Sequence, residues 1–155
     1  MDPQSGEERT PVVWQVLVES GITLRGRVPD TNWIAADRSA TIAYSRANLQ
    51  SYWRAWLNAR RHLTSVEGKA LLTDDAVRWG ALGIARVHAT ITTGRVPSKS
   101  AAAAYGLVAF PEHAAVISEA LRLRTDPLVA STYQSPLARR PDLIRFMDAV
   151  IRSGA

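Results

Sequence analysis

The sequence contains no cysteine, and Lys69 and Lys99 are the only lysines among its 155 residues. Without a thiol, the chain can form neither a disulfide nor a thiolate zinc site, and it has no cysteine nucleophile. No apolar run reaches the roughly 18 residues that indicate a membrane-spanning helix. The first ten residues lack the basic and then apolar order of a signal peptide. These absences predict a cytoplasmic protein without a membrane span.

Motifs that carry enzyme chemistry are also missing from the sequence. There is no glycine-rich phosphate loop, no dinucleotide fingerprint, no Gly-Ser dipeptide and no Gly-x-Ser-x-Gly elbow. The sequence has no Asp-x-Asp pair of the kind that holds magnesium, and its three histidines do not have zinc spacing. We therefore expect no catalytic residue and no metal ligand in this chain.

The length and composition fit one globular domain, with 46% hydrophobic residues and a net charge of +5. The positive charge is carried almost entirely by arginine, which binds phosphate and carboxylate groups in a forked geometry. A polyanionic partner and an ordinary solvated surface both explain this excess. We expect residues 1–10 to be a flexible lead-in and residues 11–155 to form a helical substrate- or nucleotide-binding domain.

Helix signals predict an all-α bundle of five to six helices. The chain has several cap and stop residues, such as Thr73, Ser98 and Gly94. Residues 64–72 and most of 125–140 read as loops, and residues 22–26 allow one short extended segment. The expected helices cover residues 11–20, 37–62, 74–93, 99–109, 111–124 and 141–153.

One face of the predicted helix 74–93 carries a candidate binding surface. Trp79, Arg86 and Thr90 are separated by seven and four residues, so they lie on roughly the same side of a regular helix. The binding signal of the sequence is concentrated in this region, between Trp79 and Lys99.

A candidate phosphate site follows where the next helix begins. Ser98 and Lys99 combine free backbone N–H groups, a positive helix dipole, a hydroxyl cap and an ammonium group. Arg86 and Arg95 could add forked contacts to the same anion. The alternative is an ordinary serine-capped helix with basic residues on its surface.

The segment from Arg86 to Pro111 contains a specific frame of residues. Arg86 is followed by Gly94, Lys99, an alanine-rich helix and Phe110-Pro111. This frame resembles the C-terminal helical domain of the aminoglycoside adenylyltransferases that modify streptomycin and spectinomycin. Residues 12–26, with a Trp and the run Gly-Ile-Thr-Leu-Arg-Gly, resemble the stretch that joins the two domains in such proteins. The similarity extends over residues 11 to 152.

The resemblance implies a division of labour between two domains. In this family a nucleotidyltransferase domain carries a Gly-Ser loop and acidic residues that bind magnesium, and the helical domain closes the cleft. Lys99 would contact the phosphates of ATP, and Arg86 would lie in the same interdomain site. The implied partners are ATP with magnesium and an aminoglycoside-like molecule, reached through a catalytic domain that these residues do not include. The chain would therefore be an accessory domain that is inactive alone.

The residues that select the drug do not follow the family pattern. Leu72 and Ala76 occupy positions where some members have residues that favour streptomycin. Asp74 and Asp75 lie close by but out of register, and with Trp79 they are weak candidates for substrate binding. The alternative role of these carboxylates is to compensate the positive end of their helix dipole.

Two other functions remain open on the sequence. Helix 74–93, the Gly94 turn and helix 99–109 superficially resemble a DNA-binding helix-turn-helix. However, residues 101–104 of the second helix are all alanine, so nucleic acid is not the expected partner. The five tryptophans also allow a protein-interacting bundle with an exposed aromatic face, which leaves self-association open.

Overall fold

The computed structural model describes residues 10–26 and 36–154, and within these ranges the chain is helical with no strand. The all-α prediction is confirmed, although the described residues form seven helices rather than five or six when the continuous α2–η3–α3 rod is counted once. The elements are α1 (Pro11–Ser20), α2 (Arg38–Asn48), the π-helical turn η3 (Leu49–Trp53), α3 (Arg54–Ala59), α4 (Val66–Ala70), α5 (Asp74–Thr93), α6 (Lys99–Ala109), the 3₁₀ turn η4 (Pro111–His113), α7 (Ala114–Thr125) and α8 (Pro136–Ser153).

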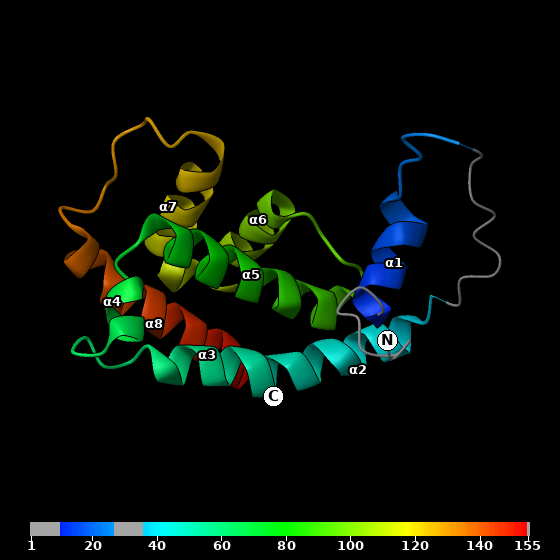
Figure 1. Cartoon of the computed structure of the whole chain (residues 1–155), viewed down its shortest axis with the longest axis horizontal. Coiled ribbons are helices and arrows are strands. Elements are labelled where there is room, and N and C mark those ends of the chain that lie inside the picture. Colours follow the sequence, from blue (N-terminus) through cyan, green and yellow to red (C-terminus); the bar gives the residue numbers. More distant parts are fainter. Residues whose placement is uncertain (1–9, 27–35, 155) are drawn as a thin grey trace.

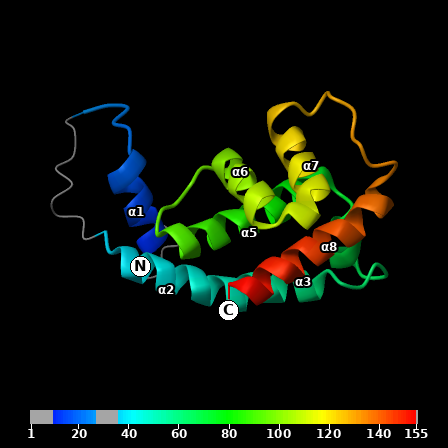
Figure 2. The same cartoon turned by 180° about the vertical axis from the view of Figure 1, so that it is seen from behind.

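The helix α5 lies at the centre of the molecule. It contacts α2, α6, α7 and α8, and the rod formed by α2, η3 and α3 runs along one side of it (Figures 1 and 2). The core is made of side chains from these elements, including Leu49, Leu82, Ile84, Phe146 and Met147, all of which are fully or almost fully buried. A helix surrounded in this way is a rigid platform for residues on its remaining exposed face.

A π-helical turn interrupts the rod at Leu49–Trp53. Such a turn inserts a residue into the helical repeat and changes the direction of the side chains that follow it. The sequence predicts one regular helix over residues 37–62, but the helix contains this turn and ends at Ala59. The rings of Tyr52 and Trp53 both come from the π turn.

Three predicted loops or boundaries are corrected by the structure. The helix α4 lies within the expected loop 64–72, because Ser65 caps it by accepting from the N–H of Gly68. The helix α8 begins at Pro136 behind the cap Ser135, and Pro141 is accommodated inside it. Proline suits the first turn, and an early interior proline removes only one helical hydrogen bond. Residues 22–26 form no strand: residues 22–23 are irregular and residues 24–26 form a bend.

The first helix attaches to the rest of the chain through buried polar groups. The hydroxyl of Thr41 on α2 donates to Oε1 of Gln15 on α1 at 3.2 Å, and both side chains are buried. The amide of Gln15 also reaches the carbonyl of Gly94 at 3.5 Å. These bonds fix α1 beside the end of α5. Residues 1–9 of the expected lead-in lie outside the described residues.

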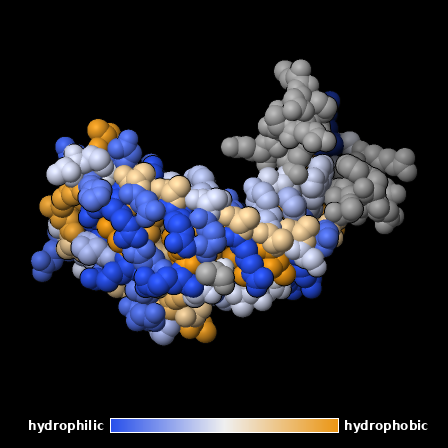
Figure 3. Space-filling model, turned by 90° about the horizontal axis from the view of Figure 1, so that it is seen from below, coloured by the Kyte–Doolittle hydropathy of each residue, from blue (hydrophilic) through white to orange (hydrophobic). Residues whose placement is uncertain are grey.

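The surface beside α2 and α3 is neither uniformly hydrophilic nor uniformly hydrophobic. In Figure 3, hydrophilic side chains cover much of this face, with hydrophobic patches dispersed among them. The part of the chain that the structure describes contains no helix with the length and hydropathy of a membrane span.

Candidate functional site

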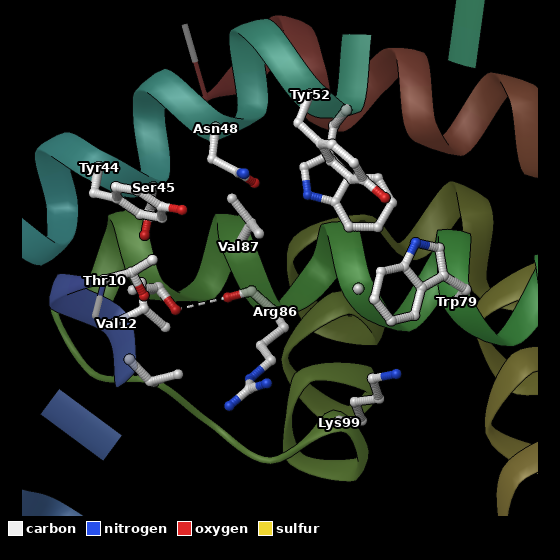
Figure 4. A pocket seen from close by; sticks show the side chains of 14 residues that line it. Thr10, Val12, Tyr44, Ser45, Asn48, Tyr52, Trp79, Arg86, Val87 and Lys99 are labelled. Carbon is white, nitrogen blue, oxygen red and sulfur yellow. Dashed lines mark hydrogen bonds between the residues drawn. The ribbon is translucent and has the colours of Figure 1, made fainter. Parts of the chain in front are cut away.

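A cavity of about 470 Å³ opens between the α2–η3 part of the rod, α5 and the start of α6. Tyr44, Asn48 and Tyr52 approach from the rod, while Arg86 and Lys99 approach from α5 and α6 (Figure 4). The prediction that the Trp79, Arg86 and Thr90 side chains share one face is confirmed, because all three line this cavity. The complete lining is Thr10, Val12, Tyr44, Ser45, Asn48, Tyr52, Trp53, Trp79, Gly83, Arg86, Val87, Thr90, Val96 and Lys99.

Packed aromatic rings form one wall of the cavity. The buried ring of Trp53 lies with its centroid 5.3 Å from that of Tyr52 and 6.1 Å from that of Trp79. Gly83 makes room for this packing, since a Cβ there would come within 2.5 Å of Cη2 of Trp53. Tyr52 and Trp79 remain 44% and 45% exposed, so their rings can still meet a ligand.

The local sequence brings α5 and α6 together at this cavity. Gly94 ends α5 with φ of +66°, a left-handed conformation that few other residues adopt. Ser98 then caps α6, and its hydroxyl accepts from the N–H of Ala101 at 3.1 Å. Lys99 is consequently the first residue of α6, where the helix dipole is positive.

Arg86 connects the two helices and also lines the cavity. Its Nε donates to the carbonyl of Pro97 at 2.7 Å, which holds the turn before α6 against α5. The other guanidinium nitrogens have no carboxylate partner within residues 10–26 and 36–154. Arg86 therefore combines a structural contact with a cationic group that an anion can approach.

Lys99 is a cation without an ion pair in the described part of the chain. Its Nζ lies 4.7 Å from the centroid of the Trp79 ring, in a cation–π contact. Burial lowers the pKa of Lys99 below its usual value, and the positive charges of Arg124, Arg86 and Arg78 lower it further. Burial likewise lowers the pKa of Arg86. A bound anion would offset the repulsion among these groups.

A second cavity of about 410 Å³ adjoins the first on the α7 side. It is lined by Asp75, Arg78, Trp79, Leu82, Lys99 and Arg124. Trp79 and Lys99 line both cavities, so the cation–π pair stands between them. Arg78 and Arg124 were not predicted as site residues. No local sequence pattern indicates that α7 lies beside the beginning of α6.

The other predicted site residues lie outside the lining of the first cavity, and most of them already form a helix cap or an ion pair. Ser98 serves as a cap, and Arg95 lines neither cavity. Asp74 pairs with Arg139 at 2.8 Å, and Asp75 pairs with Arg78 one turn along the helix. The structure thus brings together Lys99, Arg86 and Trp79, with Asp75 at the rim of the second cavity.

The histidine on α5 has a packing environment. Nδ1 of His88 lies 2.8 Å from the hydroxyl of Tyr105, its Nε2 lies 3.0 Å from Oγ of Ser153, and its ring meets Phe110 edge to face. Burial lowers the pKa of His88. Across the described residues, no three histidine, aspartate or glutamate side chains come together as a metal site.

A comparison with protein families finds a similarity over most of the chain. The family model described as the C-terminal domain of aminoglycoside adenylyltransferase matches residues 45–151. The chain belongs to this family. The matched range includes α5, α6 and α7, and with them Arg86, Lys99 and every residue that lines the second cavity. No curated protein and no solved structure matches the chain.

Membership of the adenylyltransferase C-terminal domain family confirms the resemblance carried by the Arg86 to Pro111 frame.

The aromatic wall was not predicted in full. Tyr44, Asn48 and Tyr52 reach the cavity from a rod that is distant in sequence, and a regular-helix reading does not reveal the π turn that presents Tyr52. The sequence offered one signal for these residues. Tyr44, Asn48 and Tyr52 are spaced four residues apart, which places them on one face of a helix.

Proposed function

We propose that this domain binds the phosphates of ATP and forms one wall of the cleft in which a nucleotidyltransferase domain adenylylates an acceptor. The observation that carries the proposal is the pair of cations in one cavity, Lys99 and Arg86, neither of which pairs with a carboxylate of residues 10–26 or 36–154. Partial burial disfavours the charged forms of both side chains, and a bound anion would offset this effect. Membership of the adenylyltransferase family supports ATP as that anion.

The two cations suit different parts of a phosphate chain. The ammonium group of Lys99 acts as a point charge at the positive end of α6, and the guanidinium of Arg86 can bind two oxygens in a fork. The first N–H groups of α6 add donors to the same anion. Adenylyl transfer moves AMP to an acceptor hydroxyl and releases pyrophosphate, so fixed positive charge beside the leaving phosphates lowers the barrier.

Magnesium and the general base belong to the catalytic partner in this proposal. This domain would supply the cations Lys99 and Arg86 and the aromatic wall. ATP, magnesium and the acceptor would thus meet the chain in a cleft shared with a nucleotidyltransferase domain. The family description names an aminoglycoside as the acceptor.

A thermal-unfolding titration with ATP, with and without magnesium, tests the proposal. A ligand that binds only the folded state raises Tm, and at about 100 times its Kd it adds about 2.7 kcal/mol of stability. We expect a saturable rise for the wild-type chain that is lost in Lys99→Ala. The matched control is Lys69→Ala, since Lys69 is the only other lysine and is exposed on α4. Equal shifts in both variants would contradict the proposal.

DNA recognition is less well supported by the arrangement of α6. The exposed face of this helix presents Ala101, Ala104 and Val108, which have no hydrogen-bonding groups for base edges. The hydroxyl of Tyr105 is bonded to Thr92 and lies within hydrogen-bond distance of His88. A helix with this face cannot read a major groove in the usual way.

A further inference from the structure

The helix α1 closes one end of the first cavity. Thr10, which caps α1, and Val12 in its first turn both line the cavity. In Figure 4 these two residues lie at the end of the cavity away from Trp79, and Arg86 lies between the two ends. The family match covers residues 45–151, so α1 contributes to the cavity from outside the matched range.

The attachment of α1 depends on a buried amide. Gln15 is the most deeply buried side chain of α1, whereas the apolar side chains of Val13 and Leu17 are exposed. Burying an amide is unfavourable unless its polar atoms form hydrogen bonds. The helix is therefore held in place by the partners of Gln15 more than by apolar contact.

Both ends of the Gln15 amide have partners. Its Nε2 donates to the carboxylate of Glu19 at 2.7 Å and to the carbonyl of Gly94 at 3.5 Å, and its Oε1 accepts from the hydroxyl of Thr41 at 3.2 Å. These partners determine the orientation of the amide, because a flipped amide would point its oxygen at two acceptors. Gln15 thus connects α1 both to α2 and to the end of α5.

The carbonyl of Gly94 belongs to the turn that leads to Lys99. The helix α5 ends at Gly94, and α6 begins at Lys99. Nε of Arg86 donates to the carbonyl of Pro97 at 2.7 Å, near the other end of the turn. Val96, between these two carbonyls, lines the cavity. The turn is therefore held at its start by a side chain of α1 and near its end by a side chain of α5.

We propose that α1 is part of the nucleotide site and that Gln15 is a positioning residue for this site. By holding the start of the turn, Gln15 fixes where α6 begins and so keeps the ammonium group of Lys99 over the ring of Trp79. A cation held in place in this way loses less conformational freedom when an anion binds. The inference rests on the proposed function, because it takes the cavity of Lys99 and Arg86 as the place of the ATP phosphates.

Gln15→Met is the test variant, because it keeps the length of the side chain and removes the amide. The matched control is Gln50→Met, since Gln50 also donates to the backbone carbonyl of another helix, that of Ile151 at 3.1 Å, but lines neither cavity. Calorimetric titration of the full chain with a magnesium complex of a non-hydrolysable ATP analogue measures the affinity. We expect Gln15→Met to weaken binding about fivefold, the effect of one hydrogen bond, and Gln50→Met to leave it unchanged.

A second measurement follows the position of Lys99 without any nucleotide. After reductive ¹³C-methylation, the signal of Lys99 depends on the ring current of Trp79, because its Nζ lies 4.7 Å from the ring centroid. We expect this signal to move in Gln15→Met and to stay in place in Gln50→Met. Thr41→Val removes the hydroxyl partner of Gln15 and keeps the shape of the side chain, so it should move the signal in the same direction. Thr41→Ser keeps the hydroxyl and should retain the wild-type signal.

The outcomes separate this inference from the proposed function. A Gln15→Met protein with the wild-type affinity and the wild-type Lys99 signal would overturn the inference. Equal changes in Gln15→Met and Gln50→Met would also overturn it, because they would show a general loss of stability. If Gln15→Met does not fold, the comparison of Thr41→Val with Thr41→Ser decides in the same way. If the analogue does not bind the wild-type chain, the proposed function is contradicted, and the Lys99 signal alone decides whether Gln15 positions that residue.

Discussion

The ammonium group of Lys99 lies 4.7 Å from the centroid of the Trp79 ring, and this pair separates the two cavities of the domain. The ring comes from the exposed face of α5, and the ammonium comes from the first residue of α6. The contact fixes the position of a cation that would otherwise move on a flexible four-carbon chain. The position of Lys99 therefore depends on an aromatic residue as well as on the helix cap.

Replacing Trp79 tests this dependence. We expect Trp79→Leu to weaken ATP binding several-fold, because a cation–π contact at a partly exposed site contributes about 0.5–1 kcal/mol. The free energy of unfolding should change little, since Trp79 is nearly half exposed. Trp79→Phe keeps an aromatic face and should retain most of the affinity. Equal binding by all three proteins would show that the ring does not position Lys99.

A second prediction concerns the glycine behind the aromatic wall. Gly83→Ala places a Cβ 2.5 Å from the ring of Trp53, so the variant should lose about 1–3 kcal/mol of stability through overpacking. Gly106→Ala is a matched control, because its Cβ would meet Ile117 at 3.4 Å, an ordinary contact. That control should be neutral or gain up to about 1 kcal/mol from helix propensity. Chemical denaturation of the two variants makes the comparison, and a Gly83→Ala protein as stable as Gly106→Ala would refute the packing argument.

The parts of the site that could be predicted depend on local signals. The sequence predicts Thr73 and Ser98 as N-caps and Gly94 as a helix end, and the structure confirms all three. The bounds of α5 and α6, and the position of Lys99 at the start of α6, could therefore be predicted from the sequence alone. The unpredicted parts depend on tertiary packing. The π turn that presents Tyr52, and the approach of Arg124 from α7, arise only when distant helices meet.

A third prediction concerns a buried ionic cluster. Glu119 on α7 accepts from Arg122, Ser131 and Arg139, and these bonds, that of Arg122 above all, lower its pKa from 4.5 to about 2 despite the opposing effect of burial. The carboxylate is therefore ionised more readily in the folded chain than in the unfolded chain. Its stabilisation is fully present above about pH 4.5 and is lost as the pH falls towards 2.

Replacing this carboxylate should reveal its contribution. We expect Glu119→Gln to reduce the free energy of unfolding at pH 7 by about 3 kcal/mol, because it removes the buried ionic partner that Arg139 and Arg122 share and leaves Arg139 with the exposed Asp74 alone. The variant should also lose stability less steeply than the wild type between pH 4.5 and 2. Asp148→Asn, which breaks the more exposed pair with Arg61, should cost less than about 1 kcal/mol. Parallel stability curves for Glu119→Gln and the wild type would contradict this account.

A fourth prediction follows from the cations around Lys99. Burial, followed by Arg124, Arg86 and Arg78, lowers the pKa of Lys99, so removing one of these charges should raise it. Reductive ¹³C-methylation labels both lysines, and Lys99→Arg identifies the signal of Lys99 by its loss. We expect the NMR titration midpoint of Lys99 to rise in Arg124→Gln and to stay constant in Arg152→Gln. An unchanged midpoint in both variants would show that Arg124 does not act on Lys99.

The most direct test of the central claim is to map where ATP touches the domain. In ¹H–¹⁵N NMR spectra of the 155-residue chain, magnesium ATP should shift the backbone signals of Lys99 and Ser100, the side-chain signal of Arg86 and the indole signal of Trp79. The signals of α4 and of the C-terminal turn of α8 should stay in place, because they lie outside the cavity. Shifts confined to those distant elements, or no shifts at millimolar ATP, would contradict the assignment of this cavity as the nucleotide site.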